Sequence, residues 1–169
     1  TDTLLPEVVG GWHDAADYDR RPQHFRIVRE LVGAYLMFPG KFTDGQLNIP
    51  ESGNGIPDIL DEATFGIEVW RKAQKDDGRV SDGIEATSHP GDQSWDPGKD
   101  EQRYYLGAAT RPSSLRYARA ASLLAHALIK AGAVEQGHLY LDSAIRAYQF
   151  AVTSSPVELS LAVDGQNVT

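Results

Sequence analysis

Residues 112–152 read PSSLRYARAASLLAHALIKAGAVEQGHLYLDSAIRAYQFAV, and this stretch decides the fold. Apolar side chains recur every three or four positions in each half, a spacing that places them on one face of an α-helix. The first helix is predicted from Pro112 to Ala131, with a stripe of Tyr117, Ala121, Leu124, Leu128 and Ala131. The second covers roughly 134–152, with one face formed by Leu141, Ala144, Ile145, Tyr148 and Val152. So short a link between two helices predicts an antiparallel helical hairpin.

Two further helices are predicted upstream of this hairpin. One begins at Pro22, which suits a first helical turn, and ends near Phe38, before a Pro-Gly pair. The other begins at Pro57, and its apolar stripe includes Trp70, which we expect in the core. The fold class is therefore all-α, with helices arranged as hairpins.

Long connections separate these helices. The segments 40–56 and 78–112 are polar and rich in Gly and Pro, so we expect loops there, gathered on one side of the molecule. The tail 157–163 alternates apolar and polar residues, which indicates a short strand.

The amino-acid composition argues against several classes of function. The chain has 169 residues, the length of one domain, and carries 24 Asp and Glu against 16 Lys and Arg. This acidic balance is atypical of nucleic-acid binding, and no apolar run approaches the ~20 residues that cross a bilayer. Because the chain has no Cys, disulfides and thiolate chemistry are excluded. No nucleotide or phosphate fingerprint is present, so we expect no cofactor, no nucleic-acid partner and no membrane partner.

The densest group of functional side chains lies in residues 10–19, which read GGWHDAADYD. Asp14 and Asp17 stand three positions apart, beside Trp12, His13 and Tyr18. Two carboxylates that converge on one water molecule hold it by hydrogen bonds, and one of them can remove its proton. A structural alternative stays open, in which Asp14 forms an Asx-turn and Asp17 or Asp19 caps the following helix.

Other candidate sites are weaker. The acidic residues do not match a calcium-binding loop and the histidines are scattered, so no metal site is predicted. Aromatic side chains in polar loops could pack on a sugar ring, although a partly buried structural role is equally compatible. These candidates are Trp12, Trp95, Tyr104 and Tyr105.

Residues 10–18 resemble the Gly-Gly-Trp-(His/Tyr)-Asp-Ala-Gly-Asp-(Tyr/His) motif of glycoside hydrolase family 9, the cellulase-type inverting enzymes. Ala16 is the one departure, since that family usually has Gly there. Residues 56–63, IPDILDEA, are similar to the family's next helix, which typically reads Pro-Asp-(Ile/Leu)-Leu-Asp-Glu. Residues 111–125 and 144–151 resemble the Ala-rich helices that follow, and the blocks stand in the family's order.

This resemblance implies an (α/α)6 toroid, of which the chain would supply about four helices. By motif position, Asp17 matches the catalytic base and Asp14 the partner that helps to hold the attacking water. The family's general acid is a Glu far downstream, and no Glu of this chain lies in a block that matches that downstream segment. We therefore expect residues 1–169 to be a single, incomplete N-terminal-to-middle portion of a catalytic domain, inactive until the remaining segments complete it.

The resemblance also implies a β-linked oligosaccharide or polysaccharide as substrate, as in cellulases and endoglucanases. Residues 84–90, IEATSHP, resemble instead the exo-β-glucosaminidase subgroup acting on chitosan oligosaccharides, in which Glu85 would pair with an amino-sugar ammonium. The substrate-binding candidates are Trp12, His13, Tyr18, Glu85, His89 and Trp95. A third hypothesis is a non-catalytic helical carbohydrate-binding or scaffold domain. Family resemblance implies a secreted or periplasmic protein, although the chain carries no signal peptide.

Overall fold

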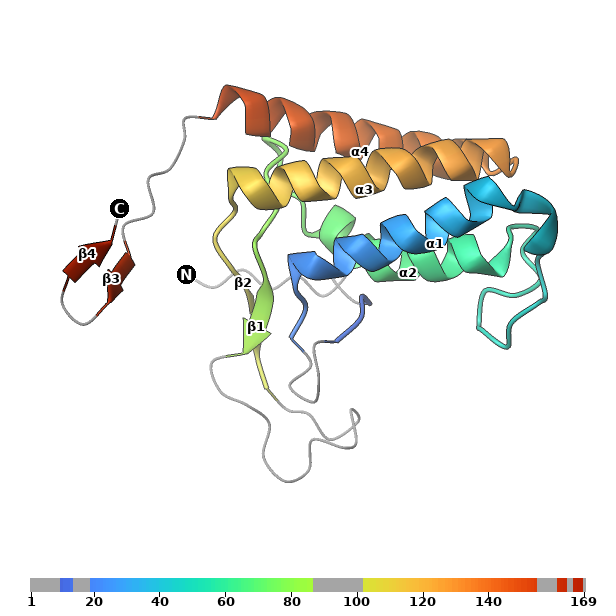
Figure 1. Cartoon of the computed structure of the whole chain (residues 1–169), viewed down its shortest axis with the longest axis horizontal. Helices are drawn as coiled ribbons and strands as arrows, with labels where there is room; N and C mark the ends of the chain where they lie inside the picture. Colours follow the sequence, from blue (N-terminus) through green and yellow to red (C-terminus); the bar gives the residue numbers. More distant parts are fainter. Residues whose placement is uncertain (1–9, 14–18, 87–101, 155–160, 164–165, 169) are drawn as a thin grey trace.

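The computed structural model describes residues 10–13, 19–86, 102–154, 161–163 and 166–168. Within them lie four α-helices: α1 (Phe25–Met37), α2 (Asp58–Lys72), α3 (Arg111–Lys130) and α4 (Val134–Thr153). Short 3-10 helices precede and follow α1, at Pro22–His24 (η1) and Pro39–Lys41 (η2). The helices lie side by side and alternate in direction, so the N-terminal ends of α1 and α3 face the same end of the molecule (Figure 1). The predicted all-α class is confirmed, with helix ends within a few residues of those expected.

The core lies where α1 meets α2 and α3. Phe25, at the start of α1, packs edge-on against Trp70 of α2 and Tyr117 of α3, with ring centroids 5.1 and 5.7 Å apart. Trp70 is 1% exposed, which confirms its predicted place in the core. Such edge-to-face pairs add to the stabilisation from burial, so three helices are joined at one aromatic cluster.

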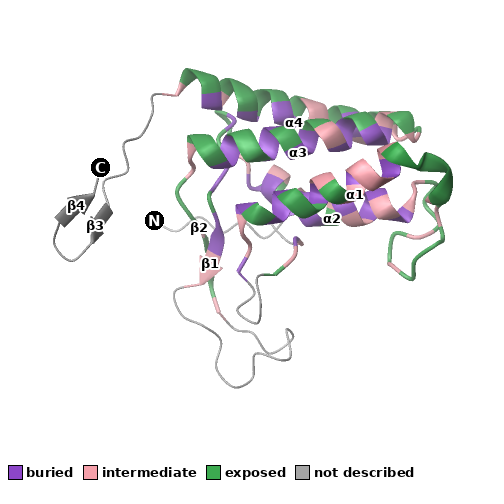
Figure 2. Cartoon of the chain, viewed as in Figure 1, coloured by how far each residue is buried: buried purple, intermediate pink, exposed green. Residues whose placement is uncertain are grey.

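The face that α4 turns towards α3 matches the predicted one only in part, because Ala144 is buried and Leu141 is partly buried, but the other three predicted residues are exposed. Ile145, Tyr148 and Val152 are 45%, 55% and 49% exposed, and α4 shows green along its outer face in Figure 2. The buried side of α4 consists mostly of small residues, with one tyrosine: Gly137, Tyr140, Ser143, Ala144, Ala147 and Ala151. Small side chains let two helices approach closely, and this contact, rather than the larger apolar stripe, sets the orientation of α4.

A polar network also links α2 to α4. The Arg71 guanidinium donates to Glu68 Oε2 from Nε at 2.7 Å, and the Tyr140 hydroxyl donates to the same carboxylate. Burial opposes ionisation of Glu68, but the hydrogen bonds from Arg71 and Tyr140 outweigh it and lower the pKa of Glu68. Burial raises the pKa of Tyr140, and the neighbouring Glu68 carboxylate raises it further, so the tyrosine stays a neutral donor.

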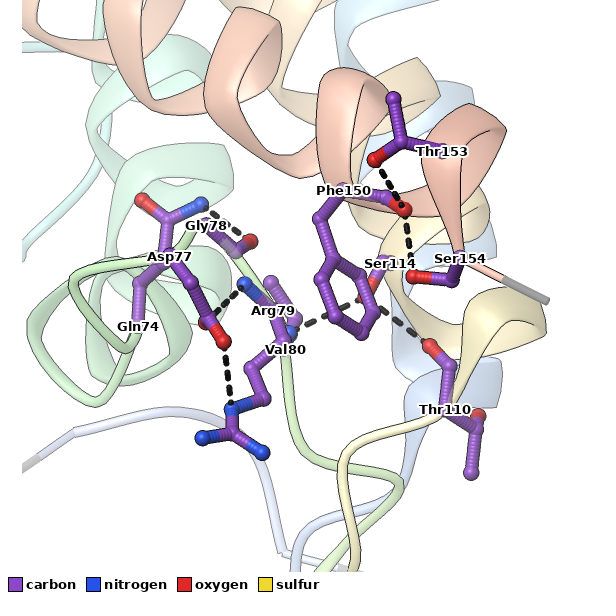
Figure 3. A network of polar contacts seen from close by, with 10 residues as sticks. All are labelled: Gln74, Asp77, Gly78, Arg79, Val80, Thr110, Ser114, Phe150, Thr153 and Ser154. Carbon is purple, nitrogen blue, oxygen red and sulfur yellow. Dashed lines mark hydrogen bonds and ion pairs between the residues drawn. The ribbon is translucent and has the colours of Figure 1, made fainter.

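The connection from α2 is fastened to the N-terminal end of α3 (Figure 3). The Val80 amide donates to Ser114 Oγ at 3.0 Å, and this hydroxyl in turn donates to the Thr110 carbonyl at 2.9 Å. Thr110 and Ser113 form a reciprocal capping box at the start of α3. Gln74 closes the turn by donating to the Gly78 carbonyl at 2.9 Å. These bonds fix where the chain leaves the helices towards the first strand.

Part of the segment expected to be loop forms a β-hairpin. Strand β1 (Ile84–Ala86) pairs antiparallel with β2 (Tyr104–Leu106), with Glu85 opposite Tyr105. The prediction of an all-loop connection over 78–112 was wrong at these residues, because strands of three residues are too short to show a period of two. At the tail, β3 (Leu161–Val163) pairs with β4 (Gln166–Val168), which confirms a short strand at 161–163. In the described part of the chain, no helix is both long and apolar enough to span a bilayer.

Candidate active site

The segment that leads into the acidic motif is held against α2 by its backbone. Gly11 has a φ of 78°, and its amide donates to the Phe65 carbonyl at 3.2 Å. A Cβ at this position would lie 2.7 Å from Val69 Cγ1, so a side chain is excluded by contact as well as by the left-handed backbone. The Gly10-Gly11 pair is therefore required for the close approach of this segment to α2.

Trp12 fastens the same segment through its side chain. Its indole Nε1 donates to Glu62 Oε1 at 2.6 Å, and its benzo ring lies on the backbone of α2 at Gly66. A Cβ built on Gly66 would lie 2.2 Å from two atoms of that ring, so α2 has space for the indole only because residue 66 is Gly. Trp12 is partly buried, and its predicted contact with substrate stays a prediction.

Arg20 joins the chain before the acidic motif to the chain after it. Its Nε donates to the Gly10 carbonyl at 2.9 Å, and an Nη lies 3.3 Å from His13 Nε2. The guanidinium also stacks over the Tyr104 ring of β2, 5.5 Å from the centroid. Sequence reasoning missed Arg20; its place directly after the motif was the available signal.

Five of the predicted site residues lie outside the described residues. They are Asp14, Asp17, Tyr18, His89 and Trp95. The structure does place the chain on either side of 14–18, and it brings Arg20 into a backbone pair with Ile84 of β1, with N···O distances of 2.8 and 3.0 Å. The residues that directly follow the acidic motif and those that precede the segment 87–101 therefore lie side by side.

Glu85 forms an ion pair with a cationic side chain of the same chain. Its carboxylate forms an ion pair with Arg21, which also donates to Asp19 Oδ2 at 2.9 Å. The second oxygen of Asp19 accepts the Ala86 amide at 3.0 Å. Arg21 is shared between the carboxylates of Glu85 and Asp19, so it offsets only part of the charge that Glu85 would offer to an amino-sugar ammonium. Its role towards such a substrate stays a prediction.

A second acidic group lies at the N-terminal end of α2. The buried Asp58 carboxylate accepts the Gly45 amide at 2.9 Å, the Leu47 amide, and the Ser52 hydroxyl at 3.1 Å. The hydrogen bond from Leu47 is the largest cause that lowers the pKa of Asp58, against the opposing effect of burial. These bonds fasten the loop between η2 and α2 to the helix.

Asp61, one turn further, is 4% exposed. Its Oδ1 accepts from Asn54 Nδ2 at 3.1 Å, while Oδ2 has no hydrogen-bond partner in the described part of the chain. Burial raises the pKa of Asp61. Repulsion from the nearby carboxylates of Glu51, Asp58 and Asp44 raises this pKa further. Because Asp58 and Asp61 accept hydrogen bonds from residues 45–54, we interpret this group as structural. No group of three or more His, Asp or Glu among the described residues is arranged to hold a metal ion.

Comparison with known proteins gives a consistent match. The family model described as Glycosyl hydrolase family 9 matches residues 4–167. A cellulose 1,4-beta-cellobiosidase of Acetivibrio thermocellus is 34% identical over 128 residues, which are 66% of this chain and 14% of that protein. A cellodextrinase of Butyrivibrio fibrisolvens is 26% identical over 95% of this chain and 29% of its own length.

A solved structure agrees with these matches. The crystal structure of a metagenome-derived glycoside hydrolase family 9 endoglucanase superposes with a TM-score of 0.83 at 34% identity, over 92% of this chain and 28% of that one. The fold is a portion of the (α/α)6 toroid that the resemblance implies. The chain thus spans less than a third of the relatives it matches.

Proposed function

The chain belongs to glycosyl hydrolase family 9, and from this membership we propose that it is a portion of an inverting β-glycosidase that hydrolyses β-1,4-linked glucose-type polysaccharide or oligosaccharide. The match over residues 4–167 carries the proposal, because it includes the acidic motif and the helix against which residues 10–13 are fastened. Relatives named as a cellobiosidase, a cellodextrinase and endoglucanases support a β-glucan substrate.

In this proposal Asp17 is the general base, and Asp14 helps to hold the attacking water. Inversion requires that the base and the general acid stand roughly 6.5–9.5 Å apart, so that a water molecule fits between the base and the anomeric carbon. The base removes a proton from this water while the acid protonates the leaving oxygen. The general acid would come from a segment outside residues 1–169. Trp12, His13, Tyr18, His89 and Trp95 would contact the sugar.

The exposed apolar face of α4 supports the proposal that other segments of the same domain complete the fold. Ile145, Tyr148 and Val152 lie on one face of this helix, and together they expose more apolar surface than scattered single residues would. Full burial of an exposed apolar side chain contributes about 1.5–3 kcal/mol, and because these are already about half buried, covering each would contribute roughly half of that, which favours a covering partner. A polysaccharide substrate is consistent with a secreted or periplasmic protein.

The test is Asp17→Asn in the complete catalytic domain, with Asp76→Asn as a control, because Asp76 is an exposed acid on the loop after α2. We expect Asp17→Asn to lower kcat on cello-oligosaccharides by at least ~100-fold with an unchanged circular dichroism spectrum, while the control retains wild-type activity. The first product seen by NMR should be the α-anomer, as inversion of a β-linkage requires.

Two results would contradict the proposal. Undiminished activity in Asp17→Asn would remove its assigned role, and a complete domain without any glycosidase activity would favour the non-catalytic carbohydrate-binding hypothesis. Release of glucosamine in preference to glucose from matched oligosaccharides, weakened by salt, would favour the exo-β-glucosaminidase alternative and its charge-based recognition.

A further inference from the structure

The carboxylate of Asp19 links two segments that carry most of the predicted site residues. Asp19 directly follows residues 14–18, and Ala86 directly precedes residues 87–101. Asp19 Oδ1 accepts the Ala86 amide at 3.0 Å, and the adjacent residues Arg20 and Ile84 exchange two backbone hydrogen bonds. Residues 19 and 86, which adjoin the two segments in the sequence, are therefore held together.

Burying the Asp19 carboxylate costs free energy, which its ion pair and hydrogen bonds must offset. The Asp19 side chain is 9% exposed, and a buried carboxylate is tolerated only when it is paired and hydrogen-bonded. Arg21 supplies the counter-charge at 2.9 Å and also pairs with Glu85 on β1. The Arg21 side chain is 31% exposed, and an ion pair that reaches solvent contributes at most about 1 kcal/mol, so the fixed geometry is the better explanation for it.

We propose that Asp19 is a positioning residue, which acts through Asp17 by holding the backbone that carries the general base. This inference rests on the proposed function. The Cα atoms of residues two apart lie within about 7 Å of each other, so the place of Asp19 limits the place of Asp17. A general base must lie within hydrogen-bond reach of the proton it removes, and small displacements cost large factors in rate. The carboxylate of Asp19 takes no part in the reaction itself.

The experiment compares Asp19→Ala, Asp19→Asn and Asp17→Asn in the complete catalytic domain, with a cello-oligosaccharide as substrate. We expect Asp19→Ala to lower kcat by roughly 10–100-fold, with KM and the dissociation constant of the oligosaccharide within about 3-fold of the wild type. Asp19→Asn keeps an acceptor for the Ala86 amide but loses the charge that pairs with Arg21, so its kcat should be intermediate.

The deciding measurement is the double variant. If Asp19 acts through Asp17, then Asp19→Ala should cost nothing further in the Asp17→Asn background, because the two losses are coupled. An equal loss in that background would overturn the inference, as would full kcat in a folded Asp19→Ala. A rise in KM at unchanged kcat would also overturn it, since that pattern marks a residue that binds substrate in the ground state.

Two controls keep the result interpretable. If Asp19→Ala does not fold, the nearly isosteric Asp19→Asn replaces it in the same cycle, and a loss of kcat independent of Asp17 contradicts the inference. If Asp17→Asn leaves activity unchanged, the proposed function itself fails. If Asp17→Asn is inactive while Asp19→Ala is fully active, only the role of Asp19 fails.

Discussion

Replacing Gly66 by Ala tests whether the contact between Trp12 and α2 positions the acidic motif. The added Cβ would lie 2.2 Å from the indole atoms Cη2 and Cζ3, far inside van der Waals contact. The indole cannot simply withdraw, because its Nε1 is bonded to Glu62 at 2.6 Å. Either the ring leaves this hydrogen bond or the backbone of residues 10–13 moves away from the helix.

Two opposing effects set the magnitude. In a helix interior Ala is favoured over Gly by about 1 kcal/mol. Overpacking costs about 1–3 kcal/mol, and losing a hydrogen bond to a charged acceptor about 1.5–3 kcal/mol. Together the two costs are about 2.5–6 kcal/mol and the helix gain offsets about 1 kcal/mol, so we expect Gly66→Ala to lower the free energy of unfolding by about 1.5–5 kcal/mol. Trp12 lies two residues before Asp14, so kcat should fall by roughly 10–100-fold.

Gly33→Ala is the matched control. Gly33 is also a helical glycine, in α1, but a Cβ there would meet no described atom within 4 Å. This variant should raise the free energy of unfolding by about 0.5–1 kcal/mol and leave kcat unchanged. Urea unfolding followed by circular dichroism, together with kcat on cello-oligosaccharides, measures both quantities for each variant. Equal stabilisation by the two substitutions, with full activity in both, would refute the reasoning.

Two further substitutions test the helix packing and the buried acid. Gly137→Ala would place a Cβ 2.5 Å from Ile129 Cγ1 and 3.0 Å from the Ala125 carbonyl oxygen, so α3 and α4 must separate. We expect the free energy of unfolding in urea to fall by about 1–2 kcal/mol. An unchanged or higher stability would show that the hairpin adapts. Burial raises the pKa of Asp61, so the stability that Asp61 contributes is full below its unfolded pKa and is lost as pH rises through the folded value. Asp61→Asn should therefore gain stability relative to the wild type as the pH rises above about 4, and a pH-independent difference would contradict this interpretation.

Most of the helical architecture could be predicted from local pattern. The spacing in residues 112–152 gave both helices of the α3–α4 hairpin to within a residue or two, because 3.6 residues per turn is imposed by backbone geometry alone. Which face of α4 would be buried could not be predicted in the same way. Ile145 and Tyr148 are larger than Ala147 and Ala151 and carry more apolar surface, yet the small residues face α3. Periodicity measures hydrophobicity around one helix and contains no information about how closely its neighbour approaches.

The candidate site likewise has a part that could be predicted from local pattern and a part that could not. Residues 10–18 could be identified from the chain alone, since a glycine pair, an aromatic residue and two carboxylates in close succession form a local pattern. The ion pair of Arg21 with Glu85 joins residues more than 60 positions apart, and so does the contact of Arg20 with Tyr104. Only the ion pair of Arg21 with Asp19 is local. No local pattern predicts such contacts.

The sequence by itself determined the helices and the family, and it is the basis of the proposal that two acids hold the water, because each depends on neighbouring positions along the chain. Only the tertiary structure decided that Trp12 lies against Gly66, that β1 and β2 pair, and that the backbone on both sides of the acidic motif is fastened. The physical reason is that these contacts form between segments that are distant in sequence and become adjacent only when the helices pack.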